Sequence, residues 1–423
     1  MEVNVLRFKS MIPSVLLLIL FSVFLSCGNR SPSFECADSI GCVSISPDDP
    51  VKIGVIQALS GKVAPLGLEQ IRGIELALDK RKGQVLGHPI TLQMEDTGCT
   101  SEGGANAVLK ILADPQMVAI FGTTCSGAAR TAAHAMSEAG LTMISGNNSA
   151  PYLTSIGGKA APEWHSGYFR TANNEENAGK AAAAFAFQKL GVRRAALIND
   201  GDIYSQGLTD GFKQAFEKLG GQIVLDTSVN KGEMMMQPVL TAAKDAGAEL
   251  LFFPLFQPEG NLILLQAVEI PEYKNIILMS DGALIEDSFI QDVRGKGKGM
   301  YFVGPASPKG PAVDALALQY QTKYNATPAN SYYLSAYDAA VLLFAAIEKA
   351  AVQEPNGTVH LGRDALRKAL YAMVEFQGVT GKLTCDKFGD CSRPAFNILR
   401  LDDPDAGVAA LQENIVFAYN SEE

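Results

Sequence analysis

The sequence predicts an α/β protein with two lobes, each built around a parallel sheet. Short apolar segments rich in β-branched residues alternate with helical segments, a pattern typical of strands buried between two layers of helices. The alternation occurs twice, and an irregular stretch at residues 146–170 separates the two series. The chain of 423 residues is also too long for one ordinary core. These three observations favour a doubly wound architecture with two similar lobes.

The first series begins with the strand VKIGVIQAL, and apolar residues at helical spacing follow it. Its second helix is stopped near Pro115. The expected strands of this series are 51–59, 90–96, 117–122 and 141–145, and the expected helices are 71–80, 105–115 and 126–139.

The second series restarts the alternation after the irregular stretch. Its expected helices are 178–191, 204–220 and 238–247, and its expected strands are 193–199, 221–226, 249–255 and 275–280. Three further helices, at 311–324, 331–351 and 363–375, precede short strands that run to the C-terminus.

The N-terminus has the pattern of an export signal. Arg7 and Lys9 precede an apolar run that ends at Cys27. The run has about 16 residues, slightly fewer than a membrane-spanning helix needs. The ending FLSC resembles a bacterial lipoprotein signal, in which the cysteine is acylated; an uncleaved anchor or a plain signal peptide is the alternative. We therefore expect a signal peptide at 1–26, a lipidated Cys27 and a flexible tether at 27–50, rich in Ser, Pro, Gly and Asp.

Composition and motifs exclude several function classes. Apolar residues make up 47% and charged residues 19%, as in a globular protein, and the net charge of −10 without a basic run argues against nucleic acid. No phosphate-binding glycine motif, nucleophile elbow or paired metal-ligand spacing of histidines occurs. We therefore expect no cofactor, no metal and no enzymatic activity.

The seven cysteines suit an oxidising compartment. If Cys27 is acylated, six remain and three pairs are possible. Cys36 and Cys42 are close together in the tether, and Cys385 and Cys391 flank a glycine-containing turn. The pair left over is Cys99 and Cys125.

Ligands of doubly wound sheets bind beyond the carboxyl ends of the strands. Cys125 and Ser126 lie at such a point, where the strand at 117–122 gives way to a helix. Free N–H groups and hydroxyls at a helix N-terminus hold a carboxylate well. The alternative is an exported enzyme whose nucleophile is Cys125, paired with a distant histidine, or Ser126, which has no nearby base in sequence.

These segments together resemble a known family. The segments are IGVIQALSGKVAPLG, IRGIELALD, EDTGC, ILADPQMVAIFGTTCSGA, MISGNNSAPYLT, FRTANN and LINDGDIYSQGLTDGF. In order and spacing they resemble the type I periplasmic solute-binding proteins of ABC importers, in the branch that binds leucine, isoleucine, valine and amides. The resemblance covers about residues 51–400.

The resemblance implies two Rossmann-like lobes joined by three crossing strands, with the ligand between them. Lobe 1 would comprise 51–171 and 303–375, and lobe 2 would comprise 172–302 and 376–423. The crossings would lie near Arg170 to Asn174, Phe302 to Pro305 and Val374 to Gly378. The family also has a disulfide that matches Cys99 and Cys125, which would fix the loop that presents Ser126.

The family's amino-acid site also carries over to this sequence. Ser126 would bind the α-carboxylate of the ligand, Ser149 its carboxylate and ammonium, and Asp281 its ammonium. The Asn147 backbone would accept from that ammonium. Tyr204 would stack over the ligand, and Phe256 would line its side-chain pocket. Leu66 replaces an aromatic residue that branched-chain binders often present.

The amides Asn147, Asn148 and Gln257 favour a ligand with a polar or small side chain over leucine. Trp164 is either a residue at the mouth of the cleft or a packing residue. The function implied is that of a monomeric, lipid-anchored binding subunit that delivers an amino acid or amide to an ABC permease. A ligand-binding sensor of the same fold is the alternative.

Overall fold

The computed structural model describes residues 34–328 and 330–420, together with Met1. The chain divides after Cys36, and the helices and strands below belong to the second unit, Ala37–Glu423. Cys27 and residues 2–26 of the predicted signal therefore lie outside the described residues. In the described part of the chain, no helix combines the length and the apolar character needed to cross a membrane.

The first half of the second unit is a six-stranded sheet in the order β3-β4-β2-β5-β6-β9. All neighbours from β4 to β9 are parallel, and only β3 is antiparallel. The strands are β3 (Gln84–Val85), β4 (His88–Asp96), β2 (Val51–Gln57), β5 (Met117–Gly122), β6 (Met143–Ser145) and β9 (Tyr168–Arg170).

Helices cover both faces of this sheet, which is why β5 is buried at every residue. One face packs in a core with α1, α10 and α11, and the other face packs in a core with α2 and α3. These helices are α1 (Ala64–Lys80), α2 (Ser101–Leu112), α3 (Ser126–Glu138), α10 (Tyr332–Ala350) and α11 (Arg363–Tyr371).

The second half contains a seven-stranded sheet in the order β11-β10-β12-β13-β14-β19-β20. Its strands are parallel up to β14, and the last two are antiparallel. They are β11 (Gln222–Ser228), β10 (Arg194–Asn199), β12 (Leu250–Phe252), β13 (Ile277–Asp281), β14 (Tyr301–Pro305), β19 (Ala395–Arg400) and β20 (Ile415–Asn420).

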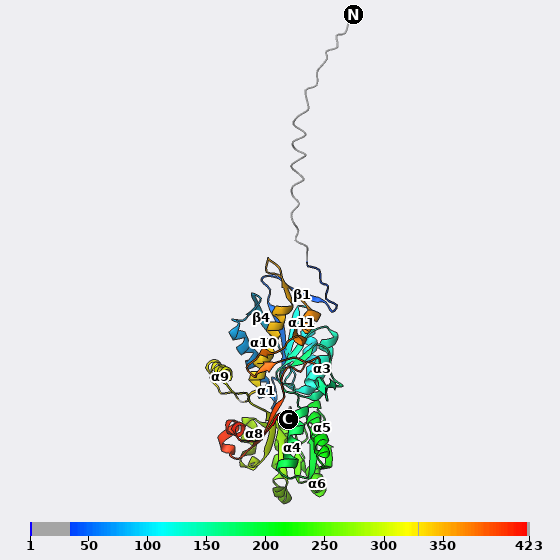
Figure 1. Ribbon diagram of the computed structural model, residues 1–423, viewed down its shortest axis with the longest axis vertical. Helices are drawn as coiled ribbons and strands as arrows, with labels where there is room; N and C mark the ends of the chain where they lie inside the picture. Colours follow the sequence, from blue (N-terminus) through cyan, green and yellow to red (C-terminus); the bar gives the residue numbers. More distant parts are fainter. Residues whose placement is uncertain (2–33, 329, 421–423) are drawn as a thin grey trace. The chain divides into compact units, whose positions relative to one another are not determined.

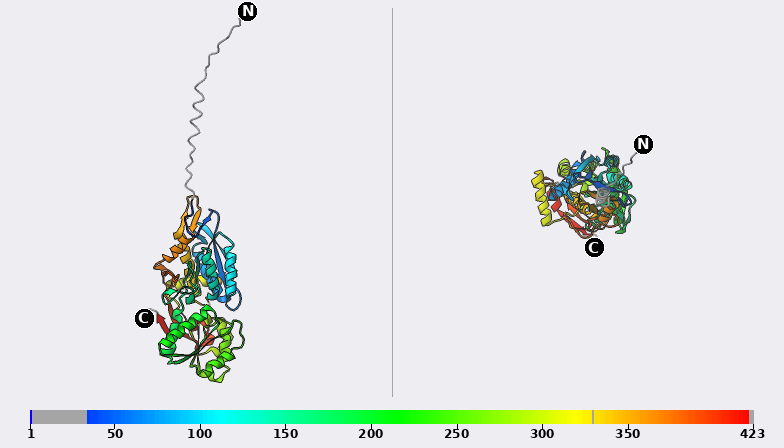
Figure 2. Two further views of the ribbon diagram at one scale, coloured as in Figure 1. Left: turned by 90° about the vertical axis from the view of Figure 1, so that its right-hand side faces the viewer. Right: turned by 90° about the horizontal axis from the view of Figure 1, so that it is seen from above.

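Separate cores again lie on the two faces of this sheet. Figure 2 shows the two halves, one composed of blue, cyan and orange segments and the other of green and red segments. The helices of the second half are α4 (Glu176–Ala184), α5 (Ile203–Lys218), α6 (Gln237–Asp245), α7 (Glu259–Ala267), α8 (Asp287–Val293) and α12 (Gly407–Glu413). Figure 1 labels α4, α5, α6 and α8. The predicted α/β fold with two lobes is confirmed.

Three segments connect the halves and bond to one another. Ser392 Oγ donates to the Ala172 carbonyl (3.1 Å), and Asn173 Nδ2 donates to the Ala395 carbonyl (3.2 Å). The same Ala395 carbonyl accepts from the Ala306 N–H at 2.9 Å. These hydrogen bonds link the three crossings, so a shift of one crossing segment alters the contacts of the others.

The third crossing lies later in the chain than the sequence analysis places it. The chain enters the seven-stranded sheet at Ala395, and not near residue 376. Residues before it stay with the first half because the disulfide-linked Cys385 and Cys391 belong to its core. Asp390, inside that loop, pairs with the buried Arg170 at 2.5 Å.

The expected tether also needs a correction. Residues Cys42–Ile45 form strand β1, which pairs with β16 (Val359–Gly362). Val43 and Ile45 are buried while Ser44 faces outward, an alternation that a short strand on the core requires. The folded part therefore begins before residue 51. Cys36 and Cys42 are both disulfide-bonded.

Candidate ligand-binding site

The predicted site residues converge on one small cavity between the two halves. Six of them line it: Leu66, Ser126, Asn147, Ser149, Tyr204 and Phe256. Thr124, Ala283 and Tyr332 complete the lining. The cavity measures about 10 Å³, room for about one water molecule, so the two halves are closed on it.

The start of α3 forms one side of this cavity. Ser126 is the first residue of the helix and Cys125 is its N-cap. The first N–H groups of a helix have no partner within it, and the helix dipole is positive there. The Ser126 hydroxyl accepts from the Ala150 N–H at 3.2 Å, which ties it to the loop after β6. This end of the site is therefore suited to a carboxylate.

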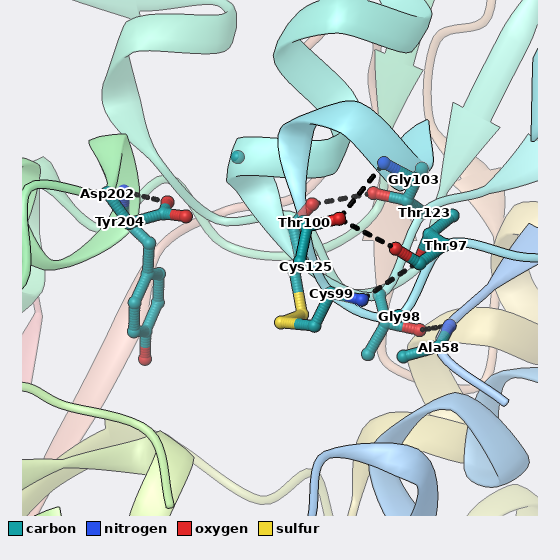
Figure 3. The surroundings of a disulfide bond; sticks show 12 residues. Ala58, Thr97, Gly98, Cys99, Thr100, Gly103, Thr123, Cys125, Asp202 and Tyr204 are labelled. Atoms are coloured by element: carbon teal, nitrogen blue, oxygen red, sulfur yellow. Dashed lines mark hydrogen bonds between the residues drawn. A yellow bond between two sulfur atoms is a disulfide. The ribbon is translucent and has the colours of Figure 1, made fainter. Parts of the chain in front are cut away.

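A disulfide between Cys99 and Cys125 holds the loop before α3 (Figure 3). Cys99 adopts a positive φ of 59°, and Thr100 directly after it caps α2 by accepting from the Gly103 N–H at 2.9 Å. The disulfide thus joins the N-termini of two neighbouring helices. The cysteine that the sequence analysis also considers as a nucleophile is 1% exposed and bonded to sulfur.

We expect the double variant Cys99→Ser/Cys125→Ser to lose about 2–5 kcal/mol of unfolding free energy. The bridge closes a segment of 26 residues, so its loss frees the unfolded chain, and it also loosens the loop that holds Ser126. Denaturant unfolding and ligand titration measure the two effects. The matched control, Cys385→Ser/Cys391→Ser, opens a segment of only 6 residues outside the small cavity and should leave affinity for a neutral amino acid nearly unchanged. Equal losses of affinity in both variants would contradict this role.

The loop after β6 supplies amide and hydroxyl groups. Ser145 Oγ accepts from the backbone N–H groups of Asn147 and Asn148, each at 3.0 Å. Asn147 Nδ2 donates to the Thr124 carbonyl at 2.8 Å, and this fixes the orientation of the amide. Its Oδ1 is buried and has no protein partner among the described residues.

Two of the predicted amides and Trp164 serve other purposes. Asn148 bonds to Thr123 and Tyr168 and is completely buried, so it supports the loop. Gln257 bonds to Ser288 and Asn261 and does not line the small cavity. Trp164 packs edge-on against Phe388 and donates to its carbonyl at 3.0 Å, which makes it a packing residue of the Cys385–Cys391 loop.

Asp281, at the end of β13, supplies a fully buried carboxylate beside the cavity. The Tyr204 hydroxyl donates to its Oδ2, and Tyr204 stacks on Phe256 with ring centroids 4.9 Å apart. Burial raises the pKa of Asp281 to about 7. No lysine or arginine is among the described residues that line the cavity. The cavity lining therefore supplies no positive charge to this carboxylate, and a positively charged group of a ligand could do so.

A second buried carboxylate, Glu175, was missed by the sequence reasoning. It follows the first crossing, and its Oε2 accepts from Ser149 Oγ at 2.7 Å. Burial, followed by the charge of Asp281, raises the pKa of Glu175 to about 8. Its position just beyond β9, at the same sheet edge as Ser126 and Ser149, is the signal that could have identified it. Tyr332, at the start of α10, carried no such signal because a helix and not a strand precedes it in the chain.

Comparisons with known proteins agree with this geometry. A family model described as periplasmic binding protein matches residues 50–396. Leu/Ile/Val-binding protein homolog 3 of Brucella melitensis is 27% identical over 374 residues, which are 88% of this chain and 96% of that protein.

Solved structures share the fold. The leucine binding protein LivK of Thermotoga maritima has a TM-score of 0.74 at 23% identity, covering 88% of this chain and 99% of that one. A solute binding protein of an ABC transporter from R. palustris, solved with benzoate, has a TM-score of 0.70 at 20% identity, covering 83% and 93%.

The matched family is one of solute-binding proteins and not of enzymes. The matched region includes both sheets up to β19, all three crossings and every residue that lines the small cavity. The chain therefore belongs to the periplasmic binding protein family, as a type I member.

Proposed function

We propose that this chain captures an amino acid in the small cavity and delivers it to an ABC importer. The observation that carries the proposal is one cavity lined by the N-terminal Ser126 of α3 and by Tyr204, whose hydroxyl donates to the buried carboxylate of Asp281. Ser126 and the first N–H groups of α3 would hold the α-carboxylate of the ligand. Asp281, with Ser149, would hold its ammonium.

The two ends of the proposed site belong to different halves of the fold. Ser126 and Ser149 come from the first half, whereas Tyr204, Phe256 and Asp281 come from the second. A ligand that contacts both ends favours the closed arrangement over an open one, and the closed form is what a permease could recognise. The names of its relatives, which specify leucine, isoleucine and valine, support an amino-acid ligand.

We also propose that Cys27 is acylated and anchors the protein, as a monomer, to a membrane outside the cytoplasm. This proposal rests on the sequence pattern alone, and mass spectrometry of the mature N-terminus tests it.

The proposed function is tested by calorimetric titration of the purified protein, after unfolding and refolding to remove bound ligand. The titrants are the twenty amino acids and simple amides. We expect at least one amino acid to bind, and Ser126→Ala to weaken it by about tenfold, because a hydrogen bond to a charged group contributes about 1.5–3 kcal/mol. Ser137→Ala, at the other end of α3, is the matched control and should leave the affinity unchanged. No binding across the whole panel would overturn the amino-acid assignment.

A further inference from the structure

A second and much larger cavity lies beside the small one, at the crossings. Its volume is about 430 Å³, and residues of all three crossing segments line it. Three residues, Asn147, Ser149 and Tyr332, line both cavities. The two cavities therefore adjoin at these three side chains.

The lining of this crossing cavity contains one buried charge. Glu175 is 5% exposed, whereas the side chains of Lys382 and Arg393 are 59% and 73% exposed and stand beside Glu375. Arg170 lies near Glu175 but is already paired with Asp390 at 2.5 Å and donates to the Ala150 carbonyl at 2.7 Å. Among the described residues that line the cavity, no lysine or arginine is buried together with the Glu175 carboxylate.

Asn147 adds a second acceptor at the junction of the cavities. Its Nδ2 is committed to the Thr124 carbonyl, so its Oδ1 is the atom left for a ligand. Asn147 is 9% exposed, and an acceptor so deeply buried is costly unless a donor reaches it. Both buried acceptors, Glu175 and Asn147, call for a ligand group that donates hydrogen bonds.

Of the two carboxylates of the site, Asp281 lines neither cavity and reaches the small one only through Tyr204. Glu175 lines the crossing cavity and not the small one, whereas the hydroxyl of Tyr204, which does line the small cavity, donates to Asp281. A neutral zwitterion brings one ammonium, so a single positive charge would face two buried carboxylates that repel each other. A buried carboxylate without a counter-charge or proton is unfavourable.

We propose that the ligand is an amino acid whose side chain ends in a cationic nitrogen, and that this nitrogen enters the crossing cavity and pairs with Glu175. This inference rests on the proposed function, because it places the α-amino and α-carboxylate groups in the small cavity. The side chain then passes Asn147, Ser149 and Tyr332 and ends where it contacts residues from the crossings. Burial and then the charge of Asp281 raise the pKa of Glu175, and the nearby Arg170, which is paired with Asp390, does not offset them.

The test compares lysine with norleucine, which has the same chain length but no terminal ammonium. Calorimetric titrations at pH 8 use the purified protein, the Glu175→Gln variant and the matched control Glu176→Gln. Glu176 is the next residue along, and it bonds to Lys180 at 2.7 Å. We expect the parent protein and Glu176→Gln to bind lysine at least about tenfold more tightly than norleucine, an interval of about 1.4 kcal/mol. In Glu175→Gln the preference should disappear while norleucine binding remains, which also shows that the variant is folded.

The outcomes separate this inference from the proposed function. If neutral amino acids bind and lysine does not bind more tightly than norleucine, the cationic side chain is refuted and the amino-acid site stands. If Glu175→Gln weakens lysine and norleucine equally, Glu175 acts on the shared α-ammonium, and the inference is again overturned. If neither these two ligands nor any of the twenty amino acids binds, the proposed function fails and this inference fails with it.

Discussion

Asp281→Asn is expected to reduce amino-acid affinity by about a hundredfold or more while the protein stays folded. Asparagine has the same shape, but it cannot supply the negative charge opposite the ligand ammonium. Removing one partner of a buried, hydrogen-bonded ion pair costs about 3–5 kcal/mol, because the other charge is left buried. Titration calorimetry of the parent and the variant with the best ligand of the panel measures the loss.

The same substitution should have the opposite effect on the protein without ligand. Asp281 is fully buried, and its strongest protein contact is the hydroxyl of Tyr204, so ionising it in the empty site is unfavourable. We therefore expect ligand-free Asp281→Asn to unfold at a higher temperature than the parent protein at pH 8. This gain in stability with a loss of binding distinguishes a ligand contact from a residue that only supports the fold.

The control for this prediction is Asp226→Asn, in the same half of the fold. Asp226 forms a partly exposed ion pair with Lys213, and such pairs contribute little. The variant should bind ligand as the parent does and unfold at nearly the same temperature. Unchanged affinity in Asp281→Asn would refute the ammonium site, and a large loss of stability would indicate that Asp281 is needed for folding.

The strand and helix order, and with it the position of the site, could be predicted from sequence. In a doubly wound sheet, the residues just after each strand meet at one edge, so Ser126, Ser149 and Asp281 could be brought together without coordinates. The repeated alternation of short apolar strands with helices was enough to indicate two lobes. The physical constraint is the topology, since parallel strands need a long crossover connection, usually a helix, between them.

The features of the site that could not be predicted depend on which hydrogen-bond or ion-pair partner each side chain has in the folded protein. Asn147, Asn148 and Gln257 are the same kind of side chain in sequence, but only Asn147 keeps a free acceptor near the site. Glu175 looked like an ordinary acidic residue at the start of a helix, although it is buried against Ser149. The third crossing was misplaced because a disulfide loop holds Asp390 against Arg170, and this pairing spans 220 residues of sequence.

Ligand affinity is expected to rise as the pH increases from 6 to 8. A cationic ligand binds the ionised form of Asp281, whose pKa is raised to about 7 in the empty site. Below that pH the carboxyl must first release its proton. The apparent affinity is then lower by the factor 1 + 10^(pKa − pH). The gain from pH 6 to pH 8 is therefore about tenfold for this group alone. Calorimetry in buffers of different ionisation enthalpy measures both the affinity and the protons released.

Stability without ligand should change in the opposite direction. The pKa values of Glu175 and Glu286 are also raised, to about 8 and about 7, whereas unfolded carboxyls titrate near pH 4. Between these limits the folded protein holds more protons than the unfolded chain, so its stability falls as pH rises from about 4 to about 8. The unfolding temperature measured by calorimetry should be several degrees lower at pH 8 than at pH 5. The difference should be smaller in Glu175→Gln/Asp281→Asn, which keeps only the contributions of other carboxyls with a raised pKa, such as Glu286 and Asp338. A saturating amino-acid ligand should reduce the drop in the parent protein, because its ammonium stabilises the ionised Asp281. If the parent and the double variant lost stability equally, the carboxylates at this site would not be the groups that titrate.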